Sequence, residues 1–208
     1  MAINLEKGQK INLKKDNGSM LQNICVGVNW GAIEKKGWFG GTSKEAVDLD
    51  ASCVLYDSSK NAIDVIYFGS LISKDGSIKH SGDDLTGDMD GDDGLDNEII
   101  TVDLNKVNPV VDKIFFFINI YLNQGQSHDF SQIPYAKIRM YEGTSSRVTK
   151  VHSSFDIATD RTYANKRALI MAKLYKRNNE WKFDAIGEPT EDKIFLETIQ
   201  TILKNFAK

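Results

Sequence analysis

An acidic, glycine-rich segment places the strongest constraint on how this chain can fold. Residues 83–98 hold eight carboxylates in sixteen residues, with no lysine or arginine among them. Crowded carboxylates repel one another and raise each other's pKa, so a compact loop of this composition needs a compensating cation. Glycines at 82, 87, 91 and 94 permit the tight turns that wrap oxygen ligands around an ion. Because the segment offers oxygen ligands and neither Cys nor His, Ca²⁺ is the first expectation and Mg²⁺ the second; a solvated, mobile loop is the alternative.

The acidic segment does not follow the EF-hand pattern. Counted from Asp88, the first, third and fifth positions are aspartates, but the sixth is Asp93 in place of glycine and the twelfth is Ile99 in place of glutamate. The flanking residues 77–80 and 99–104 have the composition of strands rather than helices. The sequence therefore predicts a calcium-type ligand set carried on β structure.

Short runs of β-forming residues separated by turn residues recur along most of the chain. This pattern predicts an all-β sandwich of mostly antiparallel strands rather than alternating βαβ units. Residues 177–180 and 57–61 have the composition of hairpin turns. The expected strands are 3–5, 10–13, 22–29, 46–56, 62–68, 98–104, 113–122, 135–141, 147–152, 168–176 and 181–186.

The strand expected at 46–56 carries a second group of carboxylates. Apolar residues alternate with polar ones over residues 47–55, so Asp48 and Asp50 project together from the face opposite the apolar side chains. If this strand lies beside the acidic segment, the two could share one or two ions and approach the six to eight oxygens that Ca²⁺ prefers. The alternative is a pair of ordinary surface acids.

One helix is expected at the C-terminus. Ile194, Ile199, Ile202, Leu203 and Phe206 recur at helical spacing behind a start at residues 189–192, and their apolar stripe is expected to pack on the sandwich. This divides the chain into a β-sandwich domain, 1–188, and a helical extension, 189–208. Residues 31–45 are expected to form a loop, in which Trp38 and Phe39 are either exposed for contact or packed on the sandwich.

Composition excludes several classes of function. There is no basic patch interleaved with aromatic residues, so nucleic-acid binding is not expected. The longest apolar run, residues 114–122, is too short to span a bilayer, and the N-terminus has no secretory signal, so a cytoplasmic location is expected. Cys25 and Cys53 lie in apolar strand contexts and do not indicate a disulfide framework.

Three segments together resemble the TerD family of tellurium-resistance and stress-response proteins. They are Val47–Leu55 (VDLDASCVL), His80–Asp93 (HSGDDLTGDMDGDD) and the hairpin Leu174–Gly187 (LYKRNNEWKFDAIG). Gly27–Trp30 and the Gly37–Gly41 insertion are similar to the TerZ-like branch. The resemblance covers roughly residues 2 to 188.

The resemblance implies a two-sheet β-sandwich, calcium binding by the acidic segment, a cytoplasmic bacterial setting and no established enzymatic activity. The chain departs from the family pattern at Asp84, where Asn is usual, and at residues 94–97, which intervene before Glu98. Either Glu98 or Asp96 could therefore complete the site. The implied metal ligands are Asp48, Asp50, Asp83, Asp84, Asp90, Asp92, Asp93 and Glu98, with Thr86 among the backbone oxygens of residues 85–87.

We therefore expect a non-enzymatic calcium-binding protein of a tellurite-resistance or stress-response system, acting with protein partners. A rival hypothesis is a metal-dependent phosphohydrolase of the haloacid dehalogenase type, with Asp48 as nucleophile in the DLDAS motif. That chemistry requires a buried parallel strand running into a helix, which this sequence does not predict. A second rival is direct thiol chemistry by Cys25 and Cys53, whose apolar contexts favour inert thiols.

Overall fold

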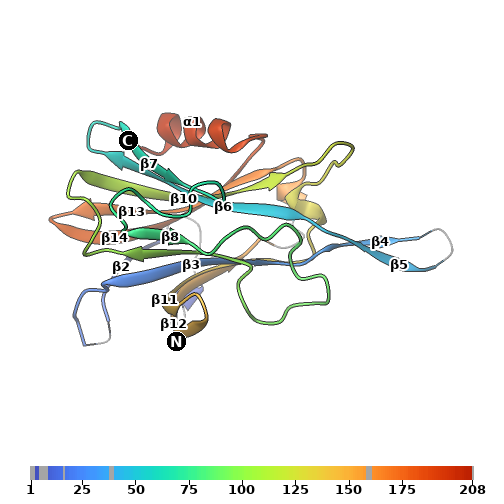
Figure 1. Ribbon diagram of the computed structural model, residues 1–208, viewed down its shortest axis with the longest axis horizontal. Helices are drawn as coiled ribbons and strands as arrows, with labels where there is room; N and C mark the ends of the chain where they lie inside the picture. Colours follow the sequence, from blue (N-terminus) through green and yellow to red (C-terminus); the bar gives the residue numbers. More distant parts are fainter. Residues whose placement is uncertain (1–2, 5–8, 16, 38–39, 158–160, 208) are drawn as a thin grey trace.

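The computed structural model describes residues 3–4, 9–15, 17–37, 40–157 and 161–207, which form two packed sheets and a C-terminal helix (Figure 1). Within these residues, sheet A has the order β1 (Ile3–Asn4), β12 (Arg147–Asp156), β11 (Ala136–Thr144), β3 (Asn23–Trp30), β9 (Glu98–Asp103) and β8 (Ile78–His80). Sheet B has the order β2 (Lys10–Asn12), β14 (Glu180–Thr190), β13 (Ala168–Arg177), β10 (Val111–Tyr121), β6 (Asp48–Asp57) and β7 (Ala62–Ile66). Most pairs are antiparallel; β1 pairs in parallel with β12. The all-β sandwich is confirmed.

The alternation expected in residues 47–55 is the pattern that β6 follows. Val47, Leu49, Ala51, Cys53 and Leu55 belong to the main core between the sheets. The intervening side chains point to the outer face of sheet B. That face changes character along β6, from Asp48 and Asp50 at one end to the apolar cluster under the helix at the other. Burial on the inner face thus fixes the register and forces both aspartates outward.

The hairpin turns are confirmed, and residues 31–45 differ from expectation. Asn178 and Asn179 both adopt positive φ, as a two-residue hairpin turn requires. The segment 31–45 is not a loop, because β4 (Ile33–Lys36) pairs with β5 (Thr42–Glu45) as a hairpin that extends from one end of the molecule (Figure 1). Its strands are largely exposed and charged, so they lack the apolar alternation by which a strand is recognised. Trp38 and Phe39 lie outside the described residues.

The C-terminal helix begins later than the sequence indicates. Strand β14 continues through Pro189 to Thr190, and α1 spans Phe195–Asn205. Pro189 pairs with Leu169 of β13, and β2 pairs only with residues 182–184, so the proline occupies an edge position where its missing N–H is tolerated. The apolar side of α1 packs on the outer face of sheet B, as expected, and Ile202 is fully buried there (Figure 1).

Candidate metal centre

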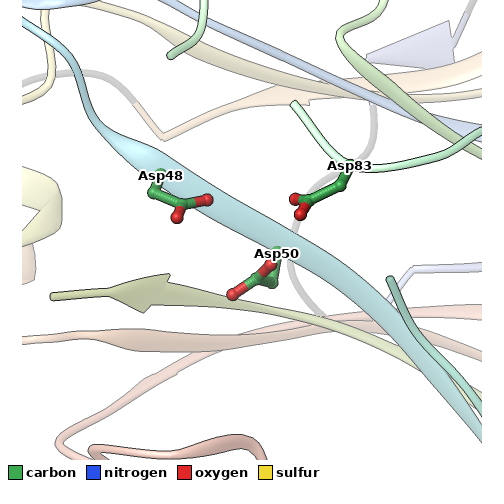
Figure 2. Close-up of side chains that lie close together, drawn as sticks. All are labelled: Asp48, Asp50 and Asp83. Carbon is green, nitrogen blue, oxygen red and sulfur yellow. The ribbon is translucent and has the colours of Figure 1, made fainter. Parts of the chain in front are cut away.

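Three carboxylates from two distant segments meet on the outer face of sheet B. Asp48 and Asp50 project from β6, and Asp83 approaches from the loop between β8 and β9 (Figure 2). One ligand oxygen of each lies within 4.8 Å of the others. We call this set the carboxylate cluster. Asp50 is buried, Asp48 is half-buried and Asp83 is exposed, so the cluster opens towards solvent on one side.

Burial and mutual repulsion make the carboxylate cluster reluctant to ionise fully. Burial, followed by the charges of Asp83, Glu98 and Asp84, raises the pKa of Asp48 to about 6. Burial, followed by the charges of Asp48, Glu98 and Asp83, raises the pKa of Asp50 to about 8. Oδ1 of Asp48 is buried and has no hydrogen-bond partner among the described residues. A bound cation would relieve both the repulsion and the unsatisfied oxygen.

The acidic segment reaches this position because β6 is longer than its neighbour β7. β7 pairs only with residues 53–56 of β6, which leaves the edge around Ala51 open. Glu98 fills this gap, since its Oε2 accepts a hydrogen bond from the backbone N–H of Ala51 at 2.7 Å. Closer to the start of the strand, the N–H of Val47 donates to the carbonyl of Thr86 at 3.4 Å. Residues of the acidic segment thus stand where a further strand would pair.

Glu98 and His80 together hold the segment against β6. The Glu98 side chain is fully buried, and its Oε1 accepts from the N–H of Asp84 at 3.1 Å. His80 Nδ1 accepts from the N–H of Gly82, which places the ring proton on Nε2, and Nε2 lies 2.9 Å from the Ala51 carbonyl. Both ring nitrogens of His80 are therefore occupied, and neither is free to bind a metal.

Asp84 serves the folding of the loop. Its Oδ1 accepts from the backbone N–H groups of Thr86 and Gly87, at 2.9 and 3.0 Å, and its Oδ2 lies 3.3 Å from Nδ2 of Asn97. Gly87 adopts φ +65°, and a Cβ there would overlap the indole of the buried Trp30. This tight turn fixes the stretch that follows Asp83.

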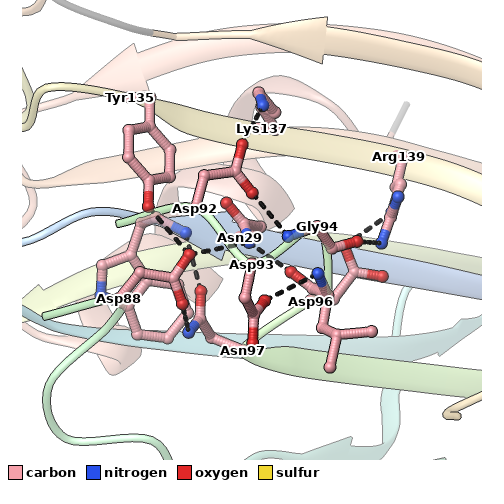
Figure 3. Close-up of polar contacts among 12 residues, drawn as sticks. Asn29, Asp88, Asp92, Asp93, Gly94, Asp96, Asn97, Tyr135, Lys137 and Arg139 are labelled. Carbon is pink, nitrogen blue, oxygen red and sulfur yellow. Dashed lines mark hydrogen bonds and ion pairs between the residues drawn. The ribbon is translucent and has the colours of Figure 1, made fainter. Parts of the chain in front are cut away.

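Asp88 is held by neutral donors. The Tyr135 hydroxyl donates to Oδ2 at 2.8 Å, Asn29 Nδ2 lies 3.2 Å from the same oxygen, and Asn97 Nδ2 donates to Oδ1 at 2.9 Å (Figure 3). The carboxylate is therefore satisfied by hydrogen bonds alone. Asn29, Asn97 and Tyr135 are residues that the sequence did not single out, because single amides and a tyrosine carry no local signal of this role.

Two aspartates in the later half of the acidic segment form ion pairs with basic residues of the same protein. Lys137 of β11 forms an ion pair with Asp92, and Nε of Arg139 donates to Oδ1 of Asp96 at 2.7 Å (Figure 3). Burial raises the pKa of Asp96 even though Arg139 opposes the shift. We call Asp92, Asp96, Lys137 and Arg139 the paired cluster. For Asp92 and Asp96 the protein therefore supplies the counter-charge, so their repulsion does not by itself require an added ion.

The structure gathers the predicted ligands into unequal groups. Asp48, Asp50 and Asp83 meet in the carboxylate cluster, with Glu98 beside them and Asp84 and Thr86 in the adjoining turn. Asp90, Asp92 and Asp93 are exposed, and Asp93 accepts a hydrogen bond from the N–H of Leu95. Of the two candidates left open, Glu98 lies against β6, whereas Asp96 is bound to Arg139.

The family model of the TerD domain matches residues 1–202, nearly the whole length of the chain. This chain belongs to the TerD domain family. It is 38% identical over 199 residues to the stress response protein SCP2 of Bacillus subtilis, covering 92% of this chain and 94% of that protein. It is 35% identical over 191 residues to the tellurium resistance protein TerD of Serratia marcescens, covering 90% of this chain and 91% of the other.

A solved structure supports the fold of this TerD-family chain. The crystal structure of a homologue of the telluride resistance protein (TerD) from Streptomyces coelicolor A3(2) superposes with a TM-score of 0.65 at 18% identity, covering 90% of this chain and 98% of that one. In addition, no helix within the described residues is both long and apolar enough to cross a membrane.

The phosphohydrolase context is absent around Asp48. Strand β6 pairs antiparallel with both β10 and β7 and runs into the turn after Asp57, so it is neither a parallel strand nor followed by a helix. The expected nucleophile position of that enzyme class is therefore not formed. Cys25 and Cys53 are buried free thiols, and burial raises the pKa of both, that of Cys25 to about 11. Neither thiol has the environment of a reactive thiolate.

Proposed function

We propose that this TerD-family chain is a non-enzymatic calcium-binding protein of a cytoplasmic stress or tellurite response, with the carboxylate cluster as its ion site. The observation that carries the proposal is the meeting of Asp48, Asp50 and Asp83, whose ligand oxygens lie within 4.8 Å of one another. Charge supports it, because none of the three forms an ion pair with a lysine or arginine within the described residues, in contrast to Asp92 and Asp96. The names of the relatives support the stress and tellurium setting.

Ca²⁺ is the ion that best suits these donors. The cluster offers carboxylate oxygens, and His80 has both nitrogens engaged, which disfavours Zn²⁺ and copper. Three carboxylates leave several coordination positions for backbone oxygens and water, as the flexible geometry of Ca²⁺ allows. A second ion at Asp92 would have to displace Lys137, so we expect the carboxylate cluster to bind first.

Ion binding would connect the two sides of the site. Asp83 belongs to the acidic segment and Asp48 and Asp50 to β6, so an ion between them would fix the exposed part of the segment to sheet B. We infer that the fixed segment then presents a surface to protein partners of the response, as in other ion-dependent switches. In this role the carboxylate cluster only binds an ion and catalyses no reaction.

Calorimetric titration of chelator-treated protein with Ca²⁺, and separately with Mg²⁺, tests the proposal. The informative pair of variants is Asp50→Asn, which removes a charge from the carboxylate cluster, and Asp92→Asn, which removes one from the paired cluster. We expect Ca²⁺ binding to weaken at least about tenfold in Asp50→Asn and to remain within about twofold in Asp92→Asn. Loss of Ca²⁺ binding only in Asp92→Asn would assign the ion site to the paired cluster instead. If titration of the unaltered protein with Ca²⁺ released or absorbed no heat, the proposal would be refuted.

A further inference from the structure

A cavity of about 280 Å³ lies on the outer face of sheet B, where α1 begins. Asp50, Ser52 and Asn119 form its floor on β6 and β10, and Phe68, Tyr121 and Ile194 surround it. An engineered protein cavity of roughly 150 Å³ holds benzene, so this volume suits one substituted ring. Asp50 also belongs to the carboxylate cluster, which places the cavity directly beside the proposed ion site.

The cavity has buried polar groups at its floor and solvent-exposed apolar side chains at its rim. Its polar floor is buried, with Asp50 8%, Ser52 1% and Asn119 4% exposed. Its apolar rim is open to solvent, with Phe68 42%, Tyr121 52% and Ile194 53% exposed. Binding sites for small molecules combine apolar walls with a few buried polar groups in this way.

One polar group on the floor lacks a partner. Nδ2 of Asn119 donates to the hydroxyl of Thr198 in α1 at 2.9 Å, which fixes the orientation of the amide. Oδ1 of the same amide is buried and has no hydrogen-bond partner among the described residues. A buried acceptor without a donor is unfavourable, so a ligand that brings a donor gains a hydrogen bond already oriented by α1.

The walls suit an aromatic or alicyclic ring. Tyr67 and Phe195 both line the cavity, and their rings stack at 5.1 Å between centroids with an interplanar angle of 20°. Phe68 meets Tyr67 edge to face at 5.3 Å, so three aromatic rings form a continuous apolar wall. Such rings favour a flat apolar partner over a flexible polar one.

We propose that this cavity binds a small ring-bearing alcohol or phenol, with its ring against the aromatic wall and its hydroxyl at the floor. A hydroxyl can donate to Asn119 Oδ1 and accept from Ser52 Oγ at the same time. The hydroxyl oxygen could also coordinate a hard cation bound by Asp50. The cavity does not depend on the ion, so the proposal stands apart from the calcium function.

The test uses the full chain in chelator-containing buffer and follows backbone amide resonances during titration with benzyl alcohol and with toluene, a probe without the hydroxyl. We expect saturable shifts at Ser52, Asn119 and Phe195, with benzyl alcohol binding at least about threefold more tightly than toluene because of one net hydrogen bond. Phe68→Ala should weaken benzyl alcohol about fivefold by removing part of the aromatic wall. The matched control is Leu203→Ala, an exposed apolar residue of α1 outside the cavity, which should leave binding unchanged.

Three results would overturn the proposal. They are an absence of saturable shifts at the cavity amides, equal affinity for benzyl alcohol and toluene, and equal weakening by Phe68→Ala and Leu203→Ala. Because the titration contains no Ca²⁺, these outcomes are independent of whether the carboxylate cluster binds an ion.

Discussion

Two groups of aspartates, each of which includes at least one residue of the acidic segment, differ in how their negative charge is balanced. In the paired cluster, Asp92 and Asp96 are neutralised by Lys137 and Arg139 of the neighbouring strand β11. In the carboxylate cluster, Asp48, Asp50 and Asp83 face one another, and burial, followed by neighbouring negative charge, raises the pKa of Asp48 and Asp50. The difference shows that acidic composition alone does not identify an ion site; converged carboxylates without a lysine or arginine partner are the better candidate.

The largest expected effect comes from Glu98, which connects the acidic segment to β6 beside the carboxylate cluster. Glu98→Ala leaves the N–H groups of Ala51 and Asp84 without their acceptor and opens a hole at a fully buried site. We expect a loss of roughly 3 to 5 kcal/mol in the free energy of unfolding, measured by denaturant titration. Glu98→Gln keeps one acceptor oxygen and should lose less. A loss below about 1 kcal/mol in the alanine variant would show that the segment is not held here.

The paired cluster can be broken from its cationic side. The Asp96 side chain is 1% exposed, so Arg139→Ala strands a buried charge and should destabilise the protein by about 2 to 3 kcal/mol. Lys137 is 49% exposed at its ion pair with Asp92, so Lys137→Ala should change stability by less than about 1 kcal/mol. Denaturant unfolding of both variants measures the contrast, and equal effects would argue against burial as its cause.

The pH dependence of the carboxylate cluster separates it from the paired cluster. The pKa of Asp48 is raised to about 6 and that of Asp50 to about 8, from a usual 3.8. Their contribution to stability is therefore fully present below about pH 4 and is lost as the pH rises through about 8 in the ion-free protein. Ca²⁺ requires the deprotonated forms, so its affinity should rise at least about tenfold between pH 6 and pH 8.

Paired measurements check this pH dependence. Thermal unfolding at several pH values, with chelator and with Ca²⁺, should show stability falling with pH in the first series and recovering in the second. Asp50→Asn should flatten both series. A calcium affinity that is the same at pH 6 and pH 8 would contradict the assignment of these two aspartates as ligands.

Asp88 is balanced in a third way, in which neutral hydrogen-bond donors take the place of a cation, and the effect predicted for removing one donor is small. Tyr135→Phe removes the hydroxyl that lies 2.8 Å from Asp88 Oδ2 but leaves the two asparagine amides in place. We expect a loss of about 1 kcal/mol in unfolding free energy and calcium affinity within about twofold of the unaltered protein. A tenfold loss of calcium affinity in Tyr135→Phe would instead show that Asp88 influences ion binding at the carboxylate cluster.

The sequence predicts the sandwich well because its signal is local. Period-two alternation over residues 47–55 assigns the inner and outer faces of β6 correctly, and the Asn178–Asn179 turn is equally legible. The hairpin of β4 and β5 escapes this reasoning because its exposed strands have no apolar face. Pro189 misled the assignment of the helix start, since it lies at a sheet edge where proline is compatible with a strand.

The composition of the site is predictable, whereas its division into two groups is not. Spacing alone places Asp48 and Asp50 on one face of a strand, and a ligand set made only of oxygens favours a hard cation. Which loop aspartate joins them depends on how the chain packs over long separations. Lys137 and Arg139 lie more than forty residues from their partners, so nothing local marks them as counter-charges. A sequence pattern cannot reveal a neutralising residue that only the tertiary fold delivers.

The capping of β6 also bears on how this molecule resists aggregation. An open strand edge is a template on which a foreign strand can add, and sheet proteins commonly block such edges. At Ala51 the backbone N–H and C=O are already hydrogen-bonded to the side chains of Glu98 and His80. The edge of β6 that β7 leaves uncovered therefore has no unpaired backbone group at Ala51 with which a foreign strand could pair. The two side chains thus protect the sandwich at the point where its edge strand ends.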